Sequence, residues 1–323
     1  MYRKGREVEK ASTSRKPGLY LGMAAALTTA ILWGSNHVVT RGMRDTIPLP
    51  SFVFWRWFIA LVFLTVFARG EIWNSKAFIL RNMGMLVFLG VVGVGLFSYL
   101  LIGSAFVSPA VEVGLLNATT PIWVVLIGIL SGADKVRGLT WCGLLMALLG
   151  TAVVLTHADL GVLAYMSFGL GNLMTVAAAI IFAWFSIRIR LFSVQCSTLV
   201  LTVVTAWAGT LLVLLPAYVI ALLYGSPALV AENADLPMAL ASLLYVAVLP
   251  TMIGNVLFLY GVKSIGPAST SIFMYFSPVF SAILAVVFLN EPLEWYHAAG
   301  FVIVVSGLLL VAMAGRAKAL DAD

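Results

Sequence analysis

The chain has 323 residues, of which 62% are hydrophobic and only 10% are charged. Soluble domains carry roughly 25% charged residues, so this composition excludes a soluble globular protein and indicates a membrane protein. The formal net charge of +6 does not indicate nucleic-acid binding, because the lysines and arginines lie between apolar runs, as they do in membrane proteins.

The first 17 residues are polar and basic, and they predict a disordered tail that ends at Pro17. No small-residue cleavage site follows the next apolar run, so a signal peptide is not expected. Beyond the tail, the chain contains apolar runs of the roughly 20 residues that a helix needs to cross a bilayer. These ten runs, called spans 1 to 10, cover residues 18–38, 50–68, 83–103, 107–130, 139–156, 168–188, 198–223, 240–262, 267–289 and 295–314.

The basic residues are distributed unevenly over the short connections between the spans. If the N-terminus is cytoplasmic, 16 of the 19 lysines and arginines lie on the cytoplasmic side. The positive-inside rule therefore predicts that both termini are cytoplasmic in a bacterial inner membrane. The expected divisions are a basic tail (1–17), a first five-span unit (18–157), a second five-span unit (158–315) and a cytoplasmic tail (316–323).

An internal repeat relates the two units. The stretch 117–150 returns 157 positions later without a gap, and a repeat of this length in an apolar chain is typical of secondary transporters. The matched pairs are Pro121 with Pro278, Asp134 with Glu291, Gly143 with Gly300, and Gly150 with Gly307. Upstream the match is looser, and Trp33 corresponds to Trp184 at an offset of 151.

The repeat is predicted to be inverted. Each unit has five spans, an odd number, so the second unit enters the membrane from the opposite side. The repeated turn supports this, since its first copy carries Lys135 and Arg137 whereas its second carries Glu291 and Glu294. An inverted repeat places a substrate site near the midplane between the halves, here between spans 1, 3, 4 and spans 6, 8, 9.

These residues resemble a known family. Trp33-Gly34-Ser35-Asn36, Arg56 in span 2, the two repeated prolines and Glu291 before a Gly-x6-Gly helix are similar to the EamA-type family of the drug/metabolite transporter superfamily. The resemblance covers the chain beyond residue 17. It implies ten helices in inverted halves and the export or exchange of small metabolites. The family commonly carries Glu at both repeated turns, whereas this chain has Asp134 at the first.

A shorter similarity points to one branch of that family. Glu112-Val113-Gly114, with Asn117 four residues before Pro121, resembles the YddG-like exporters of aromatic and other apolar amino acids. The resemblance implies amino acids as the substrate class and places Asn117 among the residues expected near the cavity.

Polar side chains within spans are few, and such residues usually face protein or a water-filled cavity. Asn36 and His37 on span 1 suit either a zwitterionic ligand or a hydrogen bond between helices. Ser98 on span 3 and Asn255 on span 8 are related by the offset of 157, so they are expected to face each other across the pseudo-axis. Tyr99 beside Ser98 offers both a ring and a hydroxyl.

Arg56 and Glu112 are the strong charges well inside spans, at similar depth from the outer boundary. Two interpretations stay open. In one, Arg56 holds a substrate carboxylate and Glu112 an ammonium group. In the other, they form a structural ion pair or extend toward the lipid headgroups. The shallow position of Glu112 favours facilitated diffusion over proton coupling.

Aromatic residues and prolines complete the candidates. Pro121 and Pro278 free one carbonyl each within a span and are candidate hinges between the halves, although a simple kink is the alternative. Aromatic side chains either line a pocket or fill gaps between helices. The full set expected at the cavity is Trp33, Asn36, His37, Ser98, Tyr99, Glu112, Asn117, Trp184, Asn255, Met274 and Tyr275.

Several functions lack their sequence signatures. The chain has no phosphate-binding loop of an ATPase and no intramembrane protease motif, and Cys142 and Cys196 lack metal-ligand spacing. No cofactor, metal or nucleic acid is expected. The prediction is a non-enzymatic exporter of small neutral or zwitterionic metabolites, most of all apolar and aromatic amino acids, acting by alternating access as a monomer or weak homo-oligomer.

The alternatives are a proton-coupled exporter of drugs or other metabolites, an intramembrane enzyme acting on lipid, and a structural membrane protein. An enzyme requires an acid/base pair at one depth, for which Glu112 and His37 are the nearest candidates. A structural protein predicts that Asn36, Tyr99 and Asn255 are sealed in a packed interior.

Overall fold

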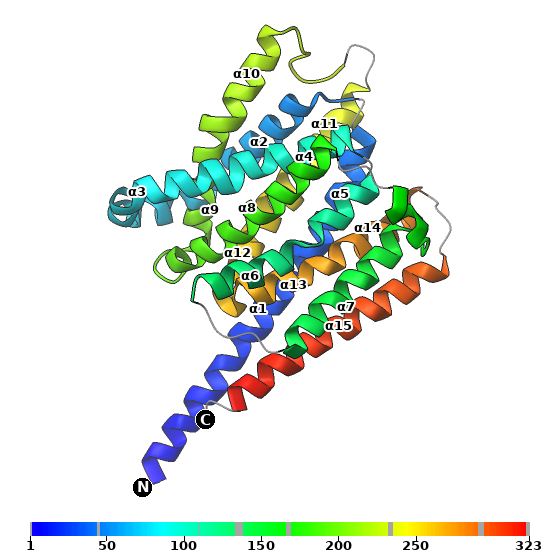
Figure 1. The fold of residues 1–323 in the computed structure, drawn as a ribbon. Coiled ribbons are helices and arrows are strands. Elements are labelled where there is room, and N and C mark those ends of the chain that lie inside the picture. Colours follow the sequence, from blue (N-terminus) through cyan, green and yellow to red (C-terminus); the bar gives the residue numbers. More distant parts are fainter. Residues whose placement is uncertain are drawn as a thin grey trace.

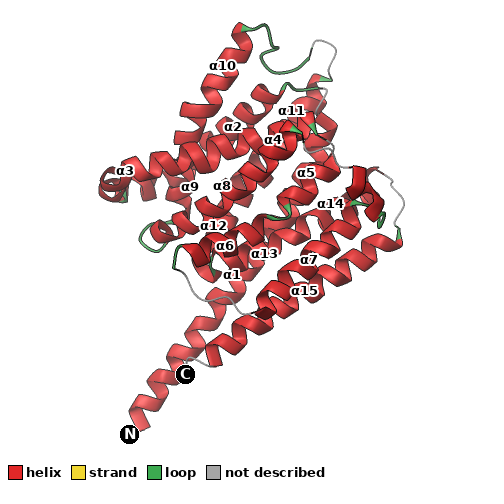
Figure 2. Ribbon diagram, in the orientation of Figure 1, coloured by secondary structure: helices red, strands yellow, loops and turns green. Residues whose placement is uncertain are grey.

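The computed structural model describes residues 2–43, 46–108, 110–132, 138–165, 169–231, 235–289 and 294–320. Every regular element in these ranges is a helix (Figures 1 and 2). Eight helical segments there are long and apolar enough to cross a membrane by length and composition, and a shorter apolar helix covers Trp295–Val311. The prediction of an all-α polytopic membrane protein is confirmed.

The predicted spans correspond to helical rods, several of which are built from more than one element. The first half contains α1 (Tyr2–Met43), α2 (Leu49–Asn74), α3 (Lys76–Gly90), η1 (Val91–Leu96), α4 (Phe97–Val107), α5 (Ala110–Asn117), α6 (Thr120–Leu130) and α7 (Gly138–Leu155). After the 3-10 turn η2 (Leu160–Tyr165), the second half contains α8 (Leu170–Ser193), α9 (Thr198–Gly209), η3 (Thr210–Leu214), α10 (Leu215–Leu223), α11 (Leu236–Val246), η4 (Ala247–Ile253), α12 (Gly254–Ile265), α13 (Pro267–Ile272), η5 (Phe273–Tyr275), α14 (Phe276–Leu289) and α15 (Trp295–Leu320).

At the N-terminus the structure continues helix α1, where the sequence predicted a disordered tail. Helix α1 begins at Tyr2 and continues through Pro17 to Met43. The segment before Pro17 contains three Lys, three Arg and two Glu residues, which lose little side-chain freedom in a helix. Because span 1 already forms a helix, extending it requires no further nucleation.

The two halves are inverted with respect to each other. Helices α7 and α15 are equivalent in the repeat, and they lie side by side along their length (Figure 1). A Cβ atom at Gly143 would lie 2.6 Å from the carbonyl oxygen of Gly307, and one at Gly150 would lie 2.8 Å from that of Gly300. The pairing is therefore antiparallel, which relates the equivalent helices by a two-fold axis across them. The four glycines allow this close backbone contact.

The other contacts between the halves are also related by the repeat. In one direction, α1 packs against α12 and α14 of the second half. In the other, α8 packs against α4, α5 and α6 of the first half. Helices α2 and α9 flank this interface, α2 against η4 and α9 against η1. We call the whole interface between the two halves the seam, and it contains the largest apolar cluster of the molecule.

Most irregular turns interrupt the helices at equivalent places in the two halves, although the π-helical stretch Thr210–Leu214 of span 7 has no counterpart in the continuous helix α2. The π-helical stretches Val91–Leu96 and Ala247–Ile253 lie about one repeat offset apart, in spans 3 and 8. Span 4 is broken between Asn117 and Thr120, and span 9 passes through the 3-10 turn Phe273–Tyr275. The repeated prolines predicted a hinge or kink in spans 4 and 9, whereas the π-helical stretches were not predicted from the sequence; together these interruptions place non-standard backbone at the seam.

Candidate functional site

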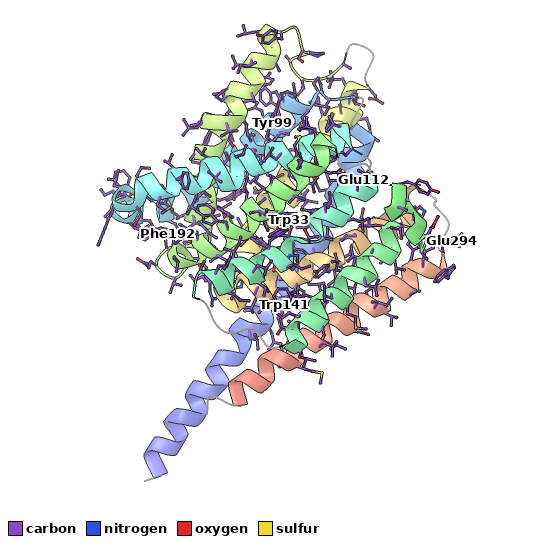
Figure 3. The ribbon with its side chains drawn as sticks, in the orientation of Figure 1. Trp33, Tyr99, Glu112, Trp141, Phe192 and Glu294 are labelled. Carbon is purple, nitrogen blue, oxygen red and sulfur yellow. The ribbon has the colours of Figure 1, made fainter. Side chains whose placement is uncertain are left out.

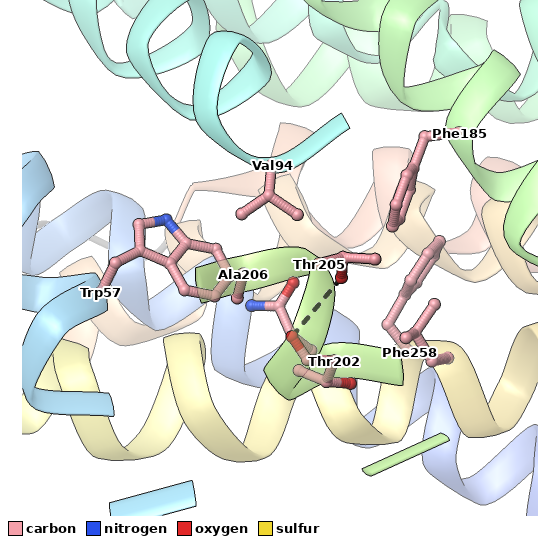
Figure 4. Close-up of a pocket in the computed structure, with 9 residues that line it drawn as sticks. Trp57, Val94, Phe185, Thr202, Thr205, Ala206 and Phe258 are labelled. Carbon is pink, nitrogen blue, oxygen red and sulfur yellow. Dashed lines mark hydrogen bonds between the residues drawn. The ribbon is translucent and has the colours of Figure 1, made fainter. Parts of the chain in front are cut away.

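A small pocket opens within the seam and is lined by both halves. Its free volume is only about 10 Å³, room for about one water molecule. Spans 2 and 3 of the first half and spans 6, 7 and 8 of the second contribute to its walls (Figure 4). The lining residues are Trp57, Val94, Phe185, Thr202, Thr205, Ala206, Asn255, Phe258 and Leu259.

The pocket combines an apolar wall with a few polar groups. Phe185 and Phe258 lie together on one side of it, opposite Trp57 (Figure 4). The hydroxyl of Thr205 donates to Leu201 O at 2.7 Å, and the Asn255 Nδ2 donates to Thr251 O at 2.7 Å. The Thr205 hydroxyl and the Asn255 amide each donate a hydrogen bond within their own helix. Their Oγ1 and Oδ1 atoms can still accept a hydrogen bond from a ligand. Such a lining can receive a small molecule with an apolar body and one or two polar groups only after the seam opens, because the present space holds about one water molecule.

Trp33 fixes span 1 to span 8 directly behind the pocket. Its Nε1 donates to Pro250 O at 3.1 Å, within the π-helical stretch η4. The indole stacks on Phe258 with ring centroids 5.3 Å apart and meets Phe182 edge-on at 5.7 Å. Figure 3 shows Trp33 in the interior of the bundle. Trp33 therefore supports the aromatic wall of the pocket from behind.

Ser98 lies behind the opposite wall. It is buried, and its Oγ accepts a hydrogen bond from Trp57 Nε1 at 3.0 Å. This bond ties span 2 to span 3 and sets the plane of the Trp57 ring at the pocket. The neighbouring Tyr99 is half-buried and packs against the same apolar cluster. The repeat-related residues Ser98 and Asn255 thus both belong to one site, Asn255 as a lining residue and Ser98 through its hydrogen bond to Trp57.

Other candidates lie elsewhere along the helices. Asn36 is buried, and its Oδ1 accepts from Thr40 Oγ1 at 3.4 Å, within α1. Trp184 is half-buried and meets Phe88 of α3 edge-on. The backbone oxygen of Asn117 accepts from Thr120 Oγ1 at the break in span 4. The side chain of His37 lies outside the described part of the structure.

Tyr275 belongs to a second apolar cluster. It is 1% exposed and packs with side chains of α6, α7, α14 and α15, away from the residues that line the pocket. Its hydroxyl makes no hydrogen bond. Met274 is half-buried in the same 3-10 turn, η5. The structure thus brings Trp33, Ser98 and Asn255 together around one pocket and places Tyr275 in the packing against α7 and α15.

The structure does not bring Arg56 and Glu112 into an ion pair. Arg56 lies on α2, which packs against η4, α9 and α4, whereas Glu112 lies on α5, which packs against α8, α7 and α4. The Arg56 Nε instead donates to Thr251 Oγ1 at 3.0 Å. The Glu112 side chain is buried and makes no hydrogen bond to another described residue. Equal depth in two spans does not by itself bring two charges together, and α2 and α5 pack against largely different helices.

Span 7 carries pocket residues that the sequence analysis missed. Thr198, Thr202, Thr205 and Gly209 follow the spacing i, i+4, i+7 and i+11, so they share one face of α9. All four are buried, and two of them line the pocket. A stripe of hydroxyls and glycine on an otherwise apolar span was the available signal. Trp57 gave no such signal, because a tryptophan alone does not indicate which way its helix faces.

The candidate hinge prolines lie at the two breaks. Pro121 is in the first turn of α6, and the hydroxyls of Thr119 and Thr120 donate to Leu116 O and Asn117 O, each at 2.6 Å. Pro278 lies in the first turn of α14, directly after η5. The freed carbonyls of the first break are therefore satisfied locally, which makes the break a stable feature of span 4.

Among the residues that the structure describes, no group of three His, Cys, Asp or Glu side chains could hold a metal ion. What the fold and the pocket define is a multi-span membrane transporter built from two inverted halves. The chain belongs to the EamA-like transporter family, whose model matches residues 20–156 and 169–313, once in each half. The resemblance to the EamA-type family of the drug/metabolite transporter superfamily is thereby confirmed.

Similar proteins also carry transporter names. The chain is 28% identical to the uncharacterised transporter YetK of Bacillus subtilis, over 92% of this chain and 87% of YetK. It is 25% identical to the probable terminal-alkyne amino-acid exporter of Streptantibioticus cattleyicolor, over 89% and 92% of the two chains. A solved crystal structure with 19% identity superposes with a TM-score of 0.74 over 93% of this chain and 99% of its own, which shows a shared fold.

Proposed function

We propose that this membrane transporter exports small neutral or zwitterionic metabolites, most of all amino acids with apolar or aromatic side chains, by alternating access. The observation that carries the proposal is the pocket at the seam, with its aromatic wall of Phe185, Phe258 and Trp57 beside the Asn255 amide. The name of the Streptantibioticus relative, an amino-acid exporter, supports the same substrate class.

In this proposal, each candidate residue has one of three roles. Asn255, Thr202 and Thr205 bind polar groups of the substrate, and the aromatic wall binds its side chain. Trp33 and Ser98 position that wall through Pro250 and Trp57. The breaks at Pro121 and Pro278 act as hinges. Asn36, His37, Tyr99, Glu112, Asn117, Trp184, Met274 and Tyr275 remain proposed cavity residues for the other conformations of the transport cycle.

Orientation and energy source belong to the same proposal. We place both termini in the cytoplasm of a bacterial cell and the spans in its inner membrane, because the basic residues gather on the side of the termini. Facilitated diffusion is the proposed mode. Most substrates of this class carry no net charge, so the membrane potential neither drives nor opposes their export.

The test is transport by the purified chain in proteoliposomes. A panel of radiolabelled amino acids is measured in counterflow, with an acidic, a basic, an apolar and an aromatic member. Saturable counterflow of L-phenylalanine or L-leucine, with little of L-lysine or L-glutamate, is the expected result. If no neutral amino acid shows saturable flux, the proposed substrate class is wrong.

A second candidate function is proton-coupled export of drugs or other metabolites. It is favoured by Glu112, a buried carboxyl group that lacks a hydrogen-bond partner among the described residues. Imposing a pH gradient on the same proteoliposomes separates the two modes. Facilitated diffusion predicts no accumulation above equilibrium, whereas coupling through Glu112 predicts accumulation that the Glu112→Gln variant loses.

A further inference from the structure

Arg56 is a buried cation inside span 2 without an acidic partner among the described residues. Its side chain is 8% exposed. The Nε atom donates to Thr251 Oγ1 at 3.0 Å, and the guanidinium carbon lies 5.8 Å from the centre of the Phe52 ring. The Nη1 atom is buried and has no hydrogen-bond partner among the residues that the structure describes. A guanidinium group has five N–H donors, so most of the hydrogen-bonding capacity of Arg56 is unused.

Such a residue is costly for a membrane protein to keep. Charged side chains at bilayer depth are rare, and those present usually pair with an opposite charge or face the pathway of a substrate. No ion pair joins Arg56 to Glu112 or to any other acid that the structure describes. The bond to Thr251 fixes the direction of the guanidinium fork and leaves its Nη side for another group. Planar bidentate binding of a carboxylate is the interaction for which this fork is best suited.

Arg56 adjoins the pocket through one turn of span 8. Thr251, which holds the guanidinium group, is one turn from Asn255, and the Asn255 Nδ2 donates to the Thr251 carbonyl oxygen. Trp57, the next residue after Arg56, lines the same pocket as Asn255. Arg56 is therefore linked to the pocket through two neighbours: Trp57, which lines it, and Thr251, whose carbonyl oxygen accepts from the lining residue Asn255.

The two halves of the repeat differ in the residues that they place near Arg56. The offset of 157 relates Thr251 to Val94. Ala206 and Val94 both line the pocket. The first half carries Val94 where the second half carries Thr251, so at this position only the second half has a hydroxyl that can hold the Arg56 guanidinium group.

We propose that Arg56 binds the carboxylate of the transported molecule and thereby restricts transport to carboxylates with an apolar body. This inference rests on the proposed function and names the group that its substrates must carry. The apolar part of the substrate lies toward Val94, Ala206 and the aromatic wall. Because Nη1 is shielded from solvent in this conformation, the carboxylate reaches it when the helices at the seam separate during the transport cycle.

The test compares an acid with its amide in the full-length protein. Counterflow is measured in proteoliposomes with L-phenylalanine and L-phenylalaninamide, which differ at the carboxylate alone. In the wild-type protein the acid is expected to have a KM about ten- to a hundredfold lower than the amide, the range of a charge-assisted hydrogen bond. In Arg56→Gln this preference disappears, because the KM of the acid rises while that of the amide stays the same. Arg56→Lys retains part of the preference.

Three controls keep the result specific. Arg69→Gln changes an exposed arginine at the other end of the same helix and is expected to leave the preference intact. Asp45→Asn and Glu232→Gln remove acids outside the described residues and are expected to leave it intact as well. If Arg56→Gln is not recovered folded, Thr251→Val removes the acceptor that orients the guanidinium group, and it is expected to raise the KM of the acid severalfold, whereas Thr251→Ser does not.

The outcomes separate this inference from the proposed function. Saturable transport of the acid and the amide with equal KM in the wild type overturns the role of Arg56 and leaves amino-acid transport standing. An equal loss of both substrates in Arg56→Gln, or the same phenotype in Asp45→Asn or Glu232→Gln, shows a structural ion pair and also overturns it. Absence of flux for every amino acid in the wild type refutes the proposed substrate class instead.

Discussion

Among the polar residues of the pocket, Asn255 is best suited to a substitution that tests substrate binding without disturbing the fold. Its amide makes one hydrogen bond, to Thr251 O in its own helix, and the side chain lines the pocket. We expect Asn255→Ala to lower kcat/KM for L-phenylalanine counterflow by about five- to tenfold, the loss of one hydrogen bond of roughly 1 kcal/mol to the substrate.

Asn82 provides the matched control for this substitution. Its Nδ2 donates to Phe78 O at 2.9 Å, the same bond within one helix, but the residue lies on α3 and does not line the pocket. Asn82→Ala should leave transport unchanged. Equal transport by both variants would remove Asn255 from the binding site, and equal unfolding temperatures would show that neither change acts through stability.

At this scale, the sequence identified residues through the repeat better than through chemistry. Ser98 and Asn255 were predicted from the offset of 157, and both belong to the pocket or its support. Equal depth suggested an Arg56–Glu112 pair that the structure lacks, because depth does not determine the direction in which a side chain leaves its helix. The threonines of span 7 were missed, since hydroxyls that bond their own helix are common in membrane spans.

Breaks in spans 4 and 9 are the elements that distinguish the seam from ordinary helix packing. Pro121 begins α6 directly after the break, and proline there prevents the backbone hydrogen bond that would join α5 to α6. We expect Pro121→Ala to lower the turnover rate severalfold with a smaller effect on KM, because a continuous helix bends less readily between the two states.

The control for this prediction is Pro216, which lies at the start of α10 in an exposed position of span 7. Pro216→Ala should change turnover little. The measurement is the maximal rate of counterflow at saturating substrate, together with the unfolding temperature in detergent. If Pro121→Ala turns over as fast as the wild type, the break in span 4 is not a hinge.

The glycine contacts between α7 and α15 hold the equivalent ends of the two halves together. A Cβ at Gly150 would lie 2.8 Å from both the Gly300 oxygen and the Val304 nitrogen, closer than ordinary packing allows. We expect Gly150→Ala to destabilise the protein by about 1–3 kcal/mol, the usual cost of an overpacked interface. Thermal or denaturant unfolding in detergent measures the change.

Gly84 on α3 gives the opposite expectation for the same substitution. Nothing lies within 4 Å of a Cβ built there, so Gly84→Ala should be neutral or stabilise by about 0.5–1 kcal/mol, because glycine is a poor helix former. A destabilisation of the same size in both variants would mean that the α7–α15 contact is not specifically tight.

The spans could be predicted from the sequence because their composition determines them. The π-helical turns within the spans were missed, because they depend on local contacts. Apolar runs of the right length identified the spans, because lipid requires continuous apolar helix. The helix before Pro17 and the π-helical stretches of spans 3 and 8 were not predicted. The π-helical stretch of span 8 contains Pro250, which has no backbone N–H to donate, and the Pro250 carbonyl oxygen accepts from Trp33 Nε1. The proline is visible in the sequence, whereas the Trp33 contact depends on packing.

At the scale of the whole molecule, the inverted repeat determines which turns share a side of the membrane. Ser131 follows α6, and Glu294 precedes α15, so they flank the two copies of the repeated turn. An antiparallel arrangement of α7 and α15 places the beginnings of these two helices at opposite ends of the pair. The repeated turns must therefore face opposite sides of the bilayer, whichever way the protein is inserted.

Cysteine labelling of intact cells tests both the inversion and the proposed orientation. Cys142 and Cys196 are the free cysteines of the chain, and both are first replaced by serine. With cytoplasmic termini, Glu294→Cys should react with a membrane-impermeant maleimide added outside. Ser131→Cys should react only after the membrane is opened. The reverse pattern would keep the inverted repeat and overturn the orientation, whereas labelling of both positions from one side contradicts the inversion, and with it the seam as the place where substrate crosses.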